Sequence, residues 1–264
     1  MAMNENDKLF NSFNLESAKL LNEGISNTSY LVNNEYVIRI KGPFLDLFNH
    51  LENEEKIINQ LKDKNFVEEV ISYNKNNGTK ISKFLPDTTR LSNPVSKEEF
   101  ALVADLLLEL HHTQISCEDF KPFERISFYK KDVYSEIDQK YEDEIINKTK
   151  KLYEKYPLVF CHNDLVHGNL LFKKDKLYLL DYEFAGKNIF LFDIASFISE
   201  NNLRDETNIK LFLSKYGNIN REELETMIRF EDILWYYWSK YLYSKTRKQI
   251  YLEIANDKLK YCKY

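Results

Sequence analysis

The stretch FCHNDLVHGNLLF, which begins at Phe160, sets five polar side chains between two apolar blocks. They are His162, Asn163, Asp164, His167 and Asn169. A solvated turn, a metal cluster and a catalytic loop supported by a buried strand are three interpretations of such a block. Phosphoryl transfer from ATP needs one carboxylate at the attacking hydroxyl, a second carboxylate and an amide oxygen on Mg²⁺, and a cation on the phosphates. Asp164 and Asn169 lie five residues apart, which suits a loop that points both side chains into one cleft.

A further carboxylate follows at the end of a predicted hairpin. Asp181 comes twelve residues after Asn169, behind two short strand-like segments, NLLFKK and KLYLLD, that flank Lys173–Lys176. Because a hairpin returns the chain to where it began, we expect Asp181 to face Asn169 across one Mg²⁺. The polar block is then a loop anchored by its apolar flanks.

The composition argues against several classes of protein. The chain has 264 residues, of which 43% are hydrophobic, so it can bury a large core. A net charge of −5 argues against nucleic-acid binding, which favours a basic face. Cys117, Cys161 and Cys262 lack CxxC spacing, which predicts neither a disulfide framework nor a zinc site and favours a reducing cytoplasm. We find no apolar segment resembling a signal peptide or a membrane span, and no indication of the oligomeric state.

The pattern of elements predicts an α+β fold. Residues 22–42 contain a turn at Asn33–Asn34 between two strand-like runs, which predicts a hairpin, and 44–64 have helical spacing. In YVIRIK the alternation puts Tyr36, Ile38 and Ile40 on one face and Val37, Arg39 and Lys41 on the other.

After about residue 95 the pattern becomes helical. Ser96 and Glu99 predict a capping box, Asn220 and Glu223 a second capping pair, and 125–156 are helical in composition. We therefore expect a small β-rich lobe, 1–86, joined to a larger, mostly helical lobe, 87–264.

Two motifs carry a family resemblance. CHNDLVHGNLLF, followed by LLDYEFAGKNIFLFDIASF, resembles the small-molecule kinases of the protein-kinase-like fold, and most of all the choline/ethanolamine kinase family of the bacterial choline kinase type. The shared pattern is H-N-D-L-x-x-G-N, then D-[aromatic]-E-[aromatic]-x-x-x-N and F-D-I-A. It falls on Asp164, Asn169, Asp181, Glu183, Asn188 and Asp193. The resemblance extends, more weakly, to most of the chain.

The resemblance implies roles for the loop. Asp164 is expected to be the catalytic base, and Asn169 and Asp181 the magnesium ligands. His162 is expected to hold the backbone of the loop, and Asp193 to brace it from the start of a helix.

The resemblance also implies a nucleotide site in the first lobe. Arg39 occupies the strand position where protein kinases use a lysine, and a guanidinium can bridge phosphate oxygens. Its expected partner is Glu54, with Glu52 and Glu55 as rivals. Ser26 and Asn27 are expected to contact the nucleotide. Their loop departs from the family pattern, because it has the single glycine Gly24 where the family has two adjacent small residues, and so offers fewer close backbone N–H groups.

The acceptor is predicted from the segment ILWYYWSKY. Trp235, Trp238 and Tyr241 recur at i, i+3 and i+6, and the family forms its choline pocket with such a W-x-x-W pair. Aromatic rings suit a quaternary ammonium because it has no N–H donors. Tyr182 and Glu183 are expected to add a ring and a carboxylate. The alternative is that these rings belong to the core.

Other functions stay open. Ethanolamine is the nearest rival of choline, since its ammonium offers three donors to carboxylates and carbonyls. An aminoglycoside kinase is less favoured, because only Glu253 and Asp257 are acidic in 240–264. The basic residues there are Lys240, Lys245, Arg247, Lys248, Lys258, Lys260 and Lys263. A non-catalytic nucleotide-binding pseudokinase is the remaining alternative, which the intact Asp164, Asn169 and Asp181 disfavour.

Overall fold

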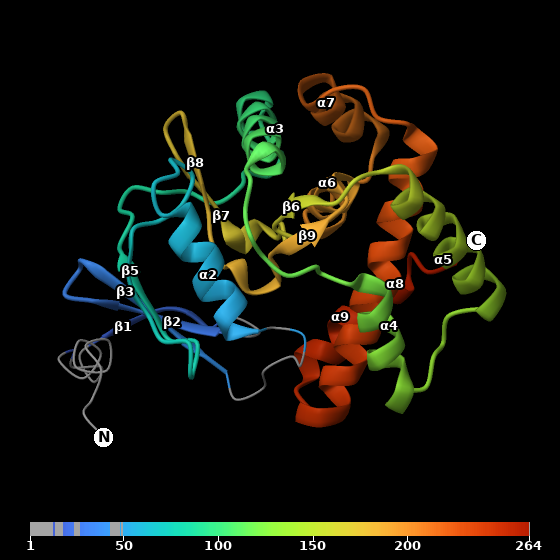
Figure 1. The fold of residues 1–264 in the computed structure, drawn as a ribbon, viewed down its shortest axis with the longest axis horizontal. Coiled ribbons are helices and arrows are strands. Elements are labelled where there is room, and N and C mark those ends of the chain that lie inside the picture. The colour runs from blue at the N-terminus through green and yellow to red at the C-terminus, as the bar shows by residue number, and fades with distance from the viewer. Residues whose placement is uncertain (1–12, 14–17, 24–26, 43–47, 49, 264) are drawn as a thin grey trace. The chain divides into compact units, whose positions relative to one another are not determined.

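The computed structural model describes residues 13, 18–23, 27–42, 48 and 50–263 (Figure 1). They pack into two compact units. The first comprises the described residues of Met1–Arg90 with Ile115–Cys117 and Leu170–Glu183. The second comprises those of Leu91–Gln114, Glu118–Asn169 and Phe184–Tyr264. The lobes 1–86 and 87–264 stay a prediction.

An antiparallel sheet forms the frame of the first unit. Its strands, in spatial order, are β1 (Lys19–Glu23), β2 (Asn27–Val32), β3 (Tyr36–Lys41), β5 (Lys80–Lys83) and β4 (Val70–Tyr73). Asn33 and Asn34 both have positive φ, 54° and 53°, which asparagine tolerates, and the predicted β2–β3 hairpin is confirmed. Ile38 packs with Val32 and Ile81, and Tyr36 and Ile40 lie against them, as the alternation predicted.

Among its described residues, this unit also contains helix α2 and a second hairpin. Helix α2 (Leu51–Leu61) buries Glu54, Ile57 and Ile58 on one face, and Figure 1 shows it beside the sheet. Strands β7 (Leu170–Lys173) and β8 (Lys176–Leu179) pair as predicted. The main chain of Leu179 donates to the carbonyl of Phe66, which ties the strand before Asp181 to the segment after α2.

Helices dominate the second unit. They are α3 (Lys97–His112), α4 (Pro122–Tyr129), α5 (Gln139–Lys155), α6 (Phe190–Glu200), α7 (Glu206–Tyr216), α8 (Arg221–Thr246) and α9 (Gln249–Leu259). The capping box of Ser96 and Glu99 is present at α3. Strands β6 (Val159–Cys161) and β9 (Gly186–Asn188) form a two-stranded antiparallel sheet, and the loop of interest follows β6. The predicted α+β class is confirmed.

Helix α8 is the centre of the second unit. It is buried on nearly all sides from Leu224 to Leu242 and packs against α4, α5, α6 and α9 (Figure 1). The predicted cap holds in part: the Asn220 side chain accepts from the main chain of Glu223, but the Glu223 carboxylate accepts from Lys155 and Tyr156 instead of closing a box.

Cys117, Cys161 and Cys262 form no disulfide bond with one another. In the part of the chain that the structure describes, no helix combines the length and the apolar character needed to span a bilayer.

Candidate active site

The loop after β6 brings Asp164 and Asn169 together. Nδ2 of Asn169 donates to the carbonyl oxygen of Asp164 and to its Oδ2, at 2.9 Å each. A short 3₁₀ turn, His167–Asn169, makes this contact possible by folding the loop back on itself. Since the amide nitrogen is used within the loop, Oδ1 of Asn169 is the atom that could bind a cation.

Asp193 holds the backbone of the same loop. It is fully buried near the start of α6, and its Oδ2 and Oδ1 accept from the main chain of His162 and Asn163, at 3.0 and 2.7 Å. The His162 side chain is itself fully buried. Ser196, one turn along α6, accepts from the main chain of Leu165 at 2.9 Å. The role of Ser196 was not predicted from the sequence, although Ser196 lies three residues after Asp193 on the same helix.

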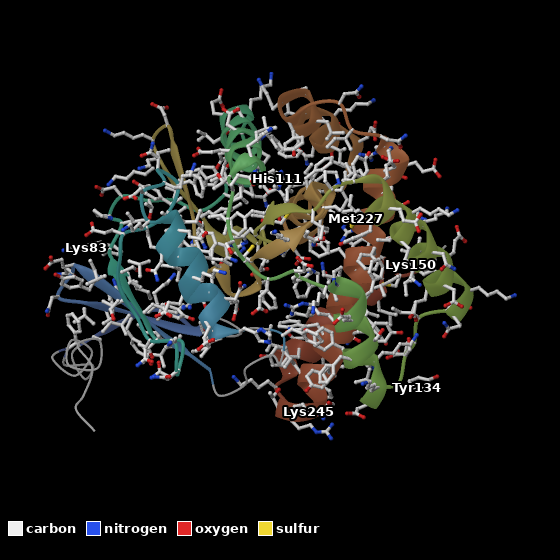
Figure 2. All side chains as sticks on the ribbon, in the orientation of Figure 1. Lys83, His111, Tyr134, Lys150, Met227 and Lys245 are labelled. Atoms are coloured by element: carbon white, nitrogen blue, oxygen red, sulfur yellow. The ribbon has the colours of Figure 1, made fainter. Side chains whose placement is uncertain are left out.

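His111 extends this support and was also missed. It lies in the interior (Figure 2), with Nε2 3.0 Å from Oδ2 of Asp193 and Nδ1 3.0 Å from the hydroxyl of Tyr216. Burial and the Asp193 carboxylate raise the pKa of Tyr216. Nearby Cys161 donates to the carbonyl of Asn188. His111, Cys161 and Asp193 lie close enough together to bind a metal ion, but their side chains form hydrogen bonds within the protein.

In the first unit an ion-pair network surrounds Asp181. Nη2 of Arg39 lies 2.5 Å from Oε1 of Glu54, while Nη1 contacts Oδ1 of Asp181. The Tyr73 hydroxyl donates to Oε2 of Glu54 at 2.8 Å. Burial opposes the charge on Glu54, but Arg39 and Lys41 outweigh it and leave the pKa of Glu54 below its usual range. Of the three candidate glutamates, Glu54 is the one that pairs with Arg39.

Asn27 and Lys41 hold the other carboxylate of the group, Glu183. Nδ2 of Asn27 donates to Oδ2 of Asp181 at 2.9 Å and lies 3.5 Å from Oε1 of Glu183. Nζ of Lys41 lies 2.9 Å from Oε2 of Glu183. Burial and the neighbouring Asp181 charge raise the pKa of Glu183. Lys41 was not singled out, yet the strand alternation that placed it on the face of Arg39 was the available signal.

The side-chain oxygens of Asp181, Glu183 and Asn27 suit a magnesium ion. Carboxylate and amide oxygens are its preferred ligands, and a cation stabilises two close carboxylates such as those of Asp181 and Glu183, which both contact Nδ2 of Asn27. Oδ1 of Asn27 is buried with no hydrogen-bond partner among the described residues, so it too could accept from a ligand. Ser26 and Gly24 lie outside the described residues, and the expected contacts of their loop stay predictions.

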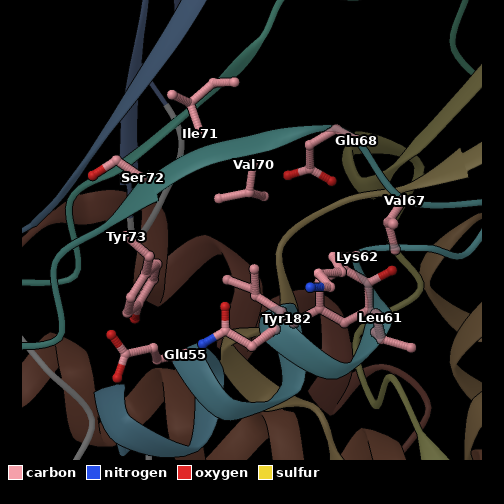
Figure 3. Close-up of a pocket in the computed structure, with 12 residues that line it drawn as sticks. Glu55, Leu61, Lys62, Val67, Glu68, Val70, Ile71, Ser72, Tyr73 and Tyr182 are labelled. Carbon is pink, nitrogen blue, oxygen red and sulfur yellow. The ribbon is translucent and has the colours of Figure 1, made fainter. Parts of the chain in front are cut away.

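Tyr182 lines a cavity of the first unit. The cavity has a volume of about 230 Å³ and is lined by α2 and the segment before and along β4, with Glu68 and Val70 on one side and Tyr73 on another (Figure 3). Tyr182 is 2% exposed. Because Tyr73 also holds Glu54, the wall of this cavity contacts the ion-pair network.

In the second unit the two tryptophans form an aromatic cluster. The rings of Trp235 and Trp238 lie 5.5 Å apart, edge to face. Phe184, missed by the sequence, packs edge-on to both at 5.3 and 6.2 Å, and Tyr251 lies 5.6 Å from Trp238. Nε1 of Trp238 is buried without a hydrogen-bond partner in the described part of the chain. Tyr241 packs instead on Phe128 and Tyr129 of α4.

Comparison with known proteins decides the family. The family model described as choline/ethanolamine kinase matches residues 18–256, which is most of the chain. The chain belongs to the choline/ethanolamine kinase family. As a member of this family it is a phosphotransferase with an alcohol group as acceptor, and it uses a nucleotide.

Two relatives illustrate the range of sequences. Protein LicA of Haemophilus influenzae is 26% identical over 184 residues, which cover 62% of this chain and 68% of that protein. An ethanolamine kinase of Saccharomyces cerevisiae is 40% identical over 74 residues, 25% of this chain and 14% of that protein. The sequence comparison therefore includes a relative named for ethanolamine.

Solved structures share the fold. The choline kinase LicA from Streptococcus pneumoniae has a TM-score of 0.77 and 20% identity, covering 93% of this chain and 92% of that one. A LicA complex with AMP has a TM-score of 0.80 and 20% identity, covering 97% and 96%. Aminoglycoside 2′-phosphotransferase-IIIa with GDP has 0.71 and 13%, covering 97% and 94%. The predicted protein-kinase-like fold is confirmed.

Proposed function

We propose that this enzyme transfers the γ-phosphoryl group of ATP to the hydroxyl of choline, giving phosphocholine and ADP. The observation that carries the choice of choline is the aromatic cluster of Trp235, Trp238 and Phe184. The negative faces of aromatic rings attract a methylated cation, at roughly 0.5–2 kcal/mol per favourable contact. The shared fold of a pneumococcal choline kinase supports the same choice.

In this proposal, residues of the loop after β6 and residues of the ion-pair network around Asp181 have different roles. Asp164 orients the choline hydroxyl and accepts its proton, held by the amide of Asn169. Asn169 and Asp181 hold Mg²⁺, which supplies the positive charge that neutralises the phosphates. The carboxylates of Asp181 and Glu183, which both contact Nδ2 of Asn27, are oxygen ligands of the kind that Mg²⁺ prefers and support this assignment. His162 and Asp193 keep the loop in place through the main-chain hydrogen bonds described above.

Arg39 grips the phosphates of ATP in the same proposal. Its pairing with Glu54, which Tyr73 steadies, supports a fixed guanidinium on the strand. Nη1 of Arg39 contacts the carboxylate of Asp181, so the guanidinium lies beside the group proposed to bind Mg²⁺. Ser26 and Asn27 contact the nucleotide, and the partnerless Oδ1 of Asn27 is the atom we assign to that contact or to the ion.

The acceptor pocket consists of Trp235 and Trp238, with Tyr182 and Glu183 contributing a ring and a carboxylate. Ethanolamine is the second candidate, favoured by the match to a yeast ethanolamine kinase. A primary ammonium offers three N–H donors and gains more from carboxylates and carbonyls than from rings. An aminoglycoside is the third candidate, since aminoglycoside 2′-phosphotransferase-IIIa shares the fold. It ranks below the other two because residues 240–264 are basic. We place the enzyme in the cytoplasm, where ATP is available and free thiols persist.

The test is an ADP-release assay with choline, ethanolamine and a panel of aminoglycosides, each with Mg²⁺ and ATP. We expect the highest kcat/KM with choline. A higher kcat/KM with ethanolamine, or turnover of aminoglycosides alone, would contradict the proposal. Nucleotide binding without turnover of any acceptor would instead indicate a pseudokinase.

A further inference from the structure

A buried carboxyl group lies one helical turn before the aromatic cluster. Glu231 of α8 is fully buried, and its Oε1 accepts a hydrogen bond from Nε1 of Trp235 at 3.3 Å. Its Oε2 shares a hydrogen bond with Oγ of Ser199 on α6. The side chain therefore joins the edge of one proposed pocket ring to a neighbouring helix.

The charged groups around Glu231 are already paired with one another. On α9, Nζ of Lys258 contacts Glu200 of α6 and lies 3.5 Å from Oδ1 of Asp232. Arg204 holds both oxygens of Asp232, at 2.6 and 2.9 Å. Within the described part of the chain, no cation forms a salt bridge with Glu231.

Burial, with the Glu200 carboxylate second, raises the pKa of Glu231 to about 8, although Lys258 and the Ser199 hydroxyl act in the opposite direction. Asp232 adds a further negative neighbour. At neutral pH the group is therefore mainly a neutral carboxylic acid.

When Glu231 is a neutral acid, each polar atom that links Trp235, Glu231, Ser199 and Glu200 has a hydrogen-bond partner. With the proton on Oε2, Glu231 donates to Oγ of Ser199, whose own hydroxyl proton points to Oε1 of Glu200, 3.4 Å away. Oε1 of Glu231 remains an acceptor for the indole N–H of Trp235. Loss of the proton would put a third carboxylate beside Glu200 and Asp232, with no cation left for it.

We propose that Glu231 is a positioning residue of the acceptor pocket, whose neutral acid form fixes the indole of Trp235, so that the pocket is assembled only while Glu231 keeps its proton. The inference rests on the proposed function, in which Trp235 contacts the acceptor cation. Glu231 itself touches no reacting group, and its effect falls on acceptor binding rather than on the phosphoryl transfer step.

The chain provides its own probe. Trp235 and Trp238 are its only tryptophans, so tryptophan fluorescence, excited at a wavelength that the 18 tyrosines do not absorb, reports on these two indoles. Glu231→Gln is the informative variant, because its amide oxygen can accept from Trp235 and its NH₂ can donate to Ser199, as the neutral acid does. Glu225→Gln, on the exposed part of the same helix, where Glu225 pairs with Arg221, is the matched control.

Fluorescence and the KM for choline are measured between pH 6 and 9.5 with the full chain at saturating Mg²⁺ and ATP. In the wild type and in Glu225→Gln we expect both to change with a midpoint near 8, the KM rising about 3- to 10-fold while kcat changes little beyond its own baseline. Glu231→Gln should keep the low-pH fluorescence and the low KM throughout. A pH-independent KM in the wild type, or an unchanged midpoint in Glu231→Gln, would overturn the inference.

Thermal unfolding gives a second, substrate-free readout. Unfolded Glu231 loses its proton near pH 4.3, whereas the folded protein holds the proton to about 8, so ionisation destabilises the fold progressively across this window and the loss levels off above it. The Tm of Glu231→Gln minus that of the wild type should therefore increase from pH 5 to pH 8. A constant difference would contradict the inference.

The two proposals fail separately. Absence of any choline-induced fluorescence change in the wild type at pH 7 would contradict choline as the acceptor of this pocket. A choline response whose pH dependence is the same in Glu231→Gln would contradict only the role of Glu231.

Discussion

Asp164 is held in place by hydrogen bonds from its own loop. The amide of Asn169 binds both its carbonyl and its carboxylate, and Asp193 anchors the backbone two positions earlier. A carboxylate fixed in this way has a defined direction before substrate arrives, which lowers the reorganisation needed in the transition state.

Asp164→Ala should therefore lower kcat by about 10²–10⁴-fold, the usual contribution of a general base, with little change in the KM for ATP. Steady-state kinetics measure both, and circular dichroism checks the fold. His167→Ala changes an exposed side chain of the same loop and should leave kcat unchanged. Activity of Asp164→Ala within a few-fold of the wild type would remove Asp164 from the base role.

Arg39 contacts two carboxylates at once, each through a different nitrogen of its planar guanidinium. Arg39→Lys should raise the KM for ATP by roughly tenfold, the equivalent of losing one charge-assisted hydrogen bond of about 1.5 kcal/mol. Isothermal titration with ATP and Mg²⁺ measures the affinity directly. Lys83→Arg, at a partly exposed strand position paired with Glu35, is the control. Equal affinity in both variants would show that Arg39 does not hold the nucleotide.

At the scale of single residues, the sequence predicted which residues matter better than it predicted which residues contact one another. The alternation in YVIRIK put Arg39 and Lys41 on one face, but the partner of Lys41, Glu183, lies on a segment far along the chain. His111 and Glu231 escaped notice because nothing local distinguishes a buried titratable group from an exposed one on a helix. Their roles depend on partners from other helices.

Among the elements, the most regular patterns were predicted best. The hairpins β2–β3 and β7–β8 and the start of α3 follow from local turn and cap chemistry. The helical composition of 125–156 concealed a break, since α4 ends at Tyr129 and α5 begins only after Asp138, which caps it. The pairing of β6 with β9 was not predicted, because two three-residue strands have no detectable period.

Strand β9 approaches another backbone closely at Gly186. A Cβ there would lie 2.7 Å from the carbonyl oxygen of Glu118, a main-chain atom that cannot rotate away. Gly186→Ala should cost about 1–3 kcal/mol and lower the Tm by about 2–10 °C.

Differential scanning calorimetry tests this. Gly168→Ala is the control, since a Cβ at Gly168 would meet nothing nearer than Val166, at 3.9 Å, and its Tm should match the wild type. Equal Tm values for the two variants would mean that the β9 segment shifts without cost.

At the scale of the whole molecule, the proposed chemistry needs residues from both compact units. Arg39, Glu54 and Asp181 belong to the first, Asp164 and Asn169 to the second. A nucleotide with Mg²⁺ that contacts all of them should stabilise the folded chain by mass action.

Saturating ATP with Mg²⁺, at about 100 times Kd, should add about 2.7 kcal/mol and raise the Tm by roughly 5–10 °C. EDTA should remove most of the shift and all turnover, and added Mg²⁺ should restore both. Asp181→Asn should show a much smaller shift relative to its own ligand-free Tm. An undiminished shift in EDTA would exclude a magnesium-dependent nucleotide site.

The most direct test of the account is competition between acceptors followed by ³¹P NMR. Equal concentrations of choline and ethanolamine are incubated with the enzyme, Mg²⁺ and limiting ATP. We predict that the γ-phosphoryl signal is converted mainly to phosphocholine while ADP appears in equal amount. Conversion mainly to phosphoethanolamine, or to inorganic phosphate alone, would contradict the choline kinase account.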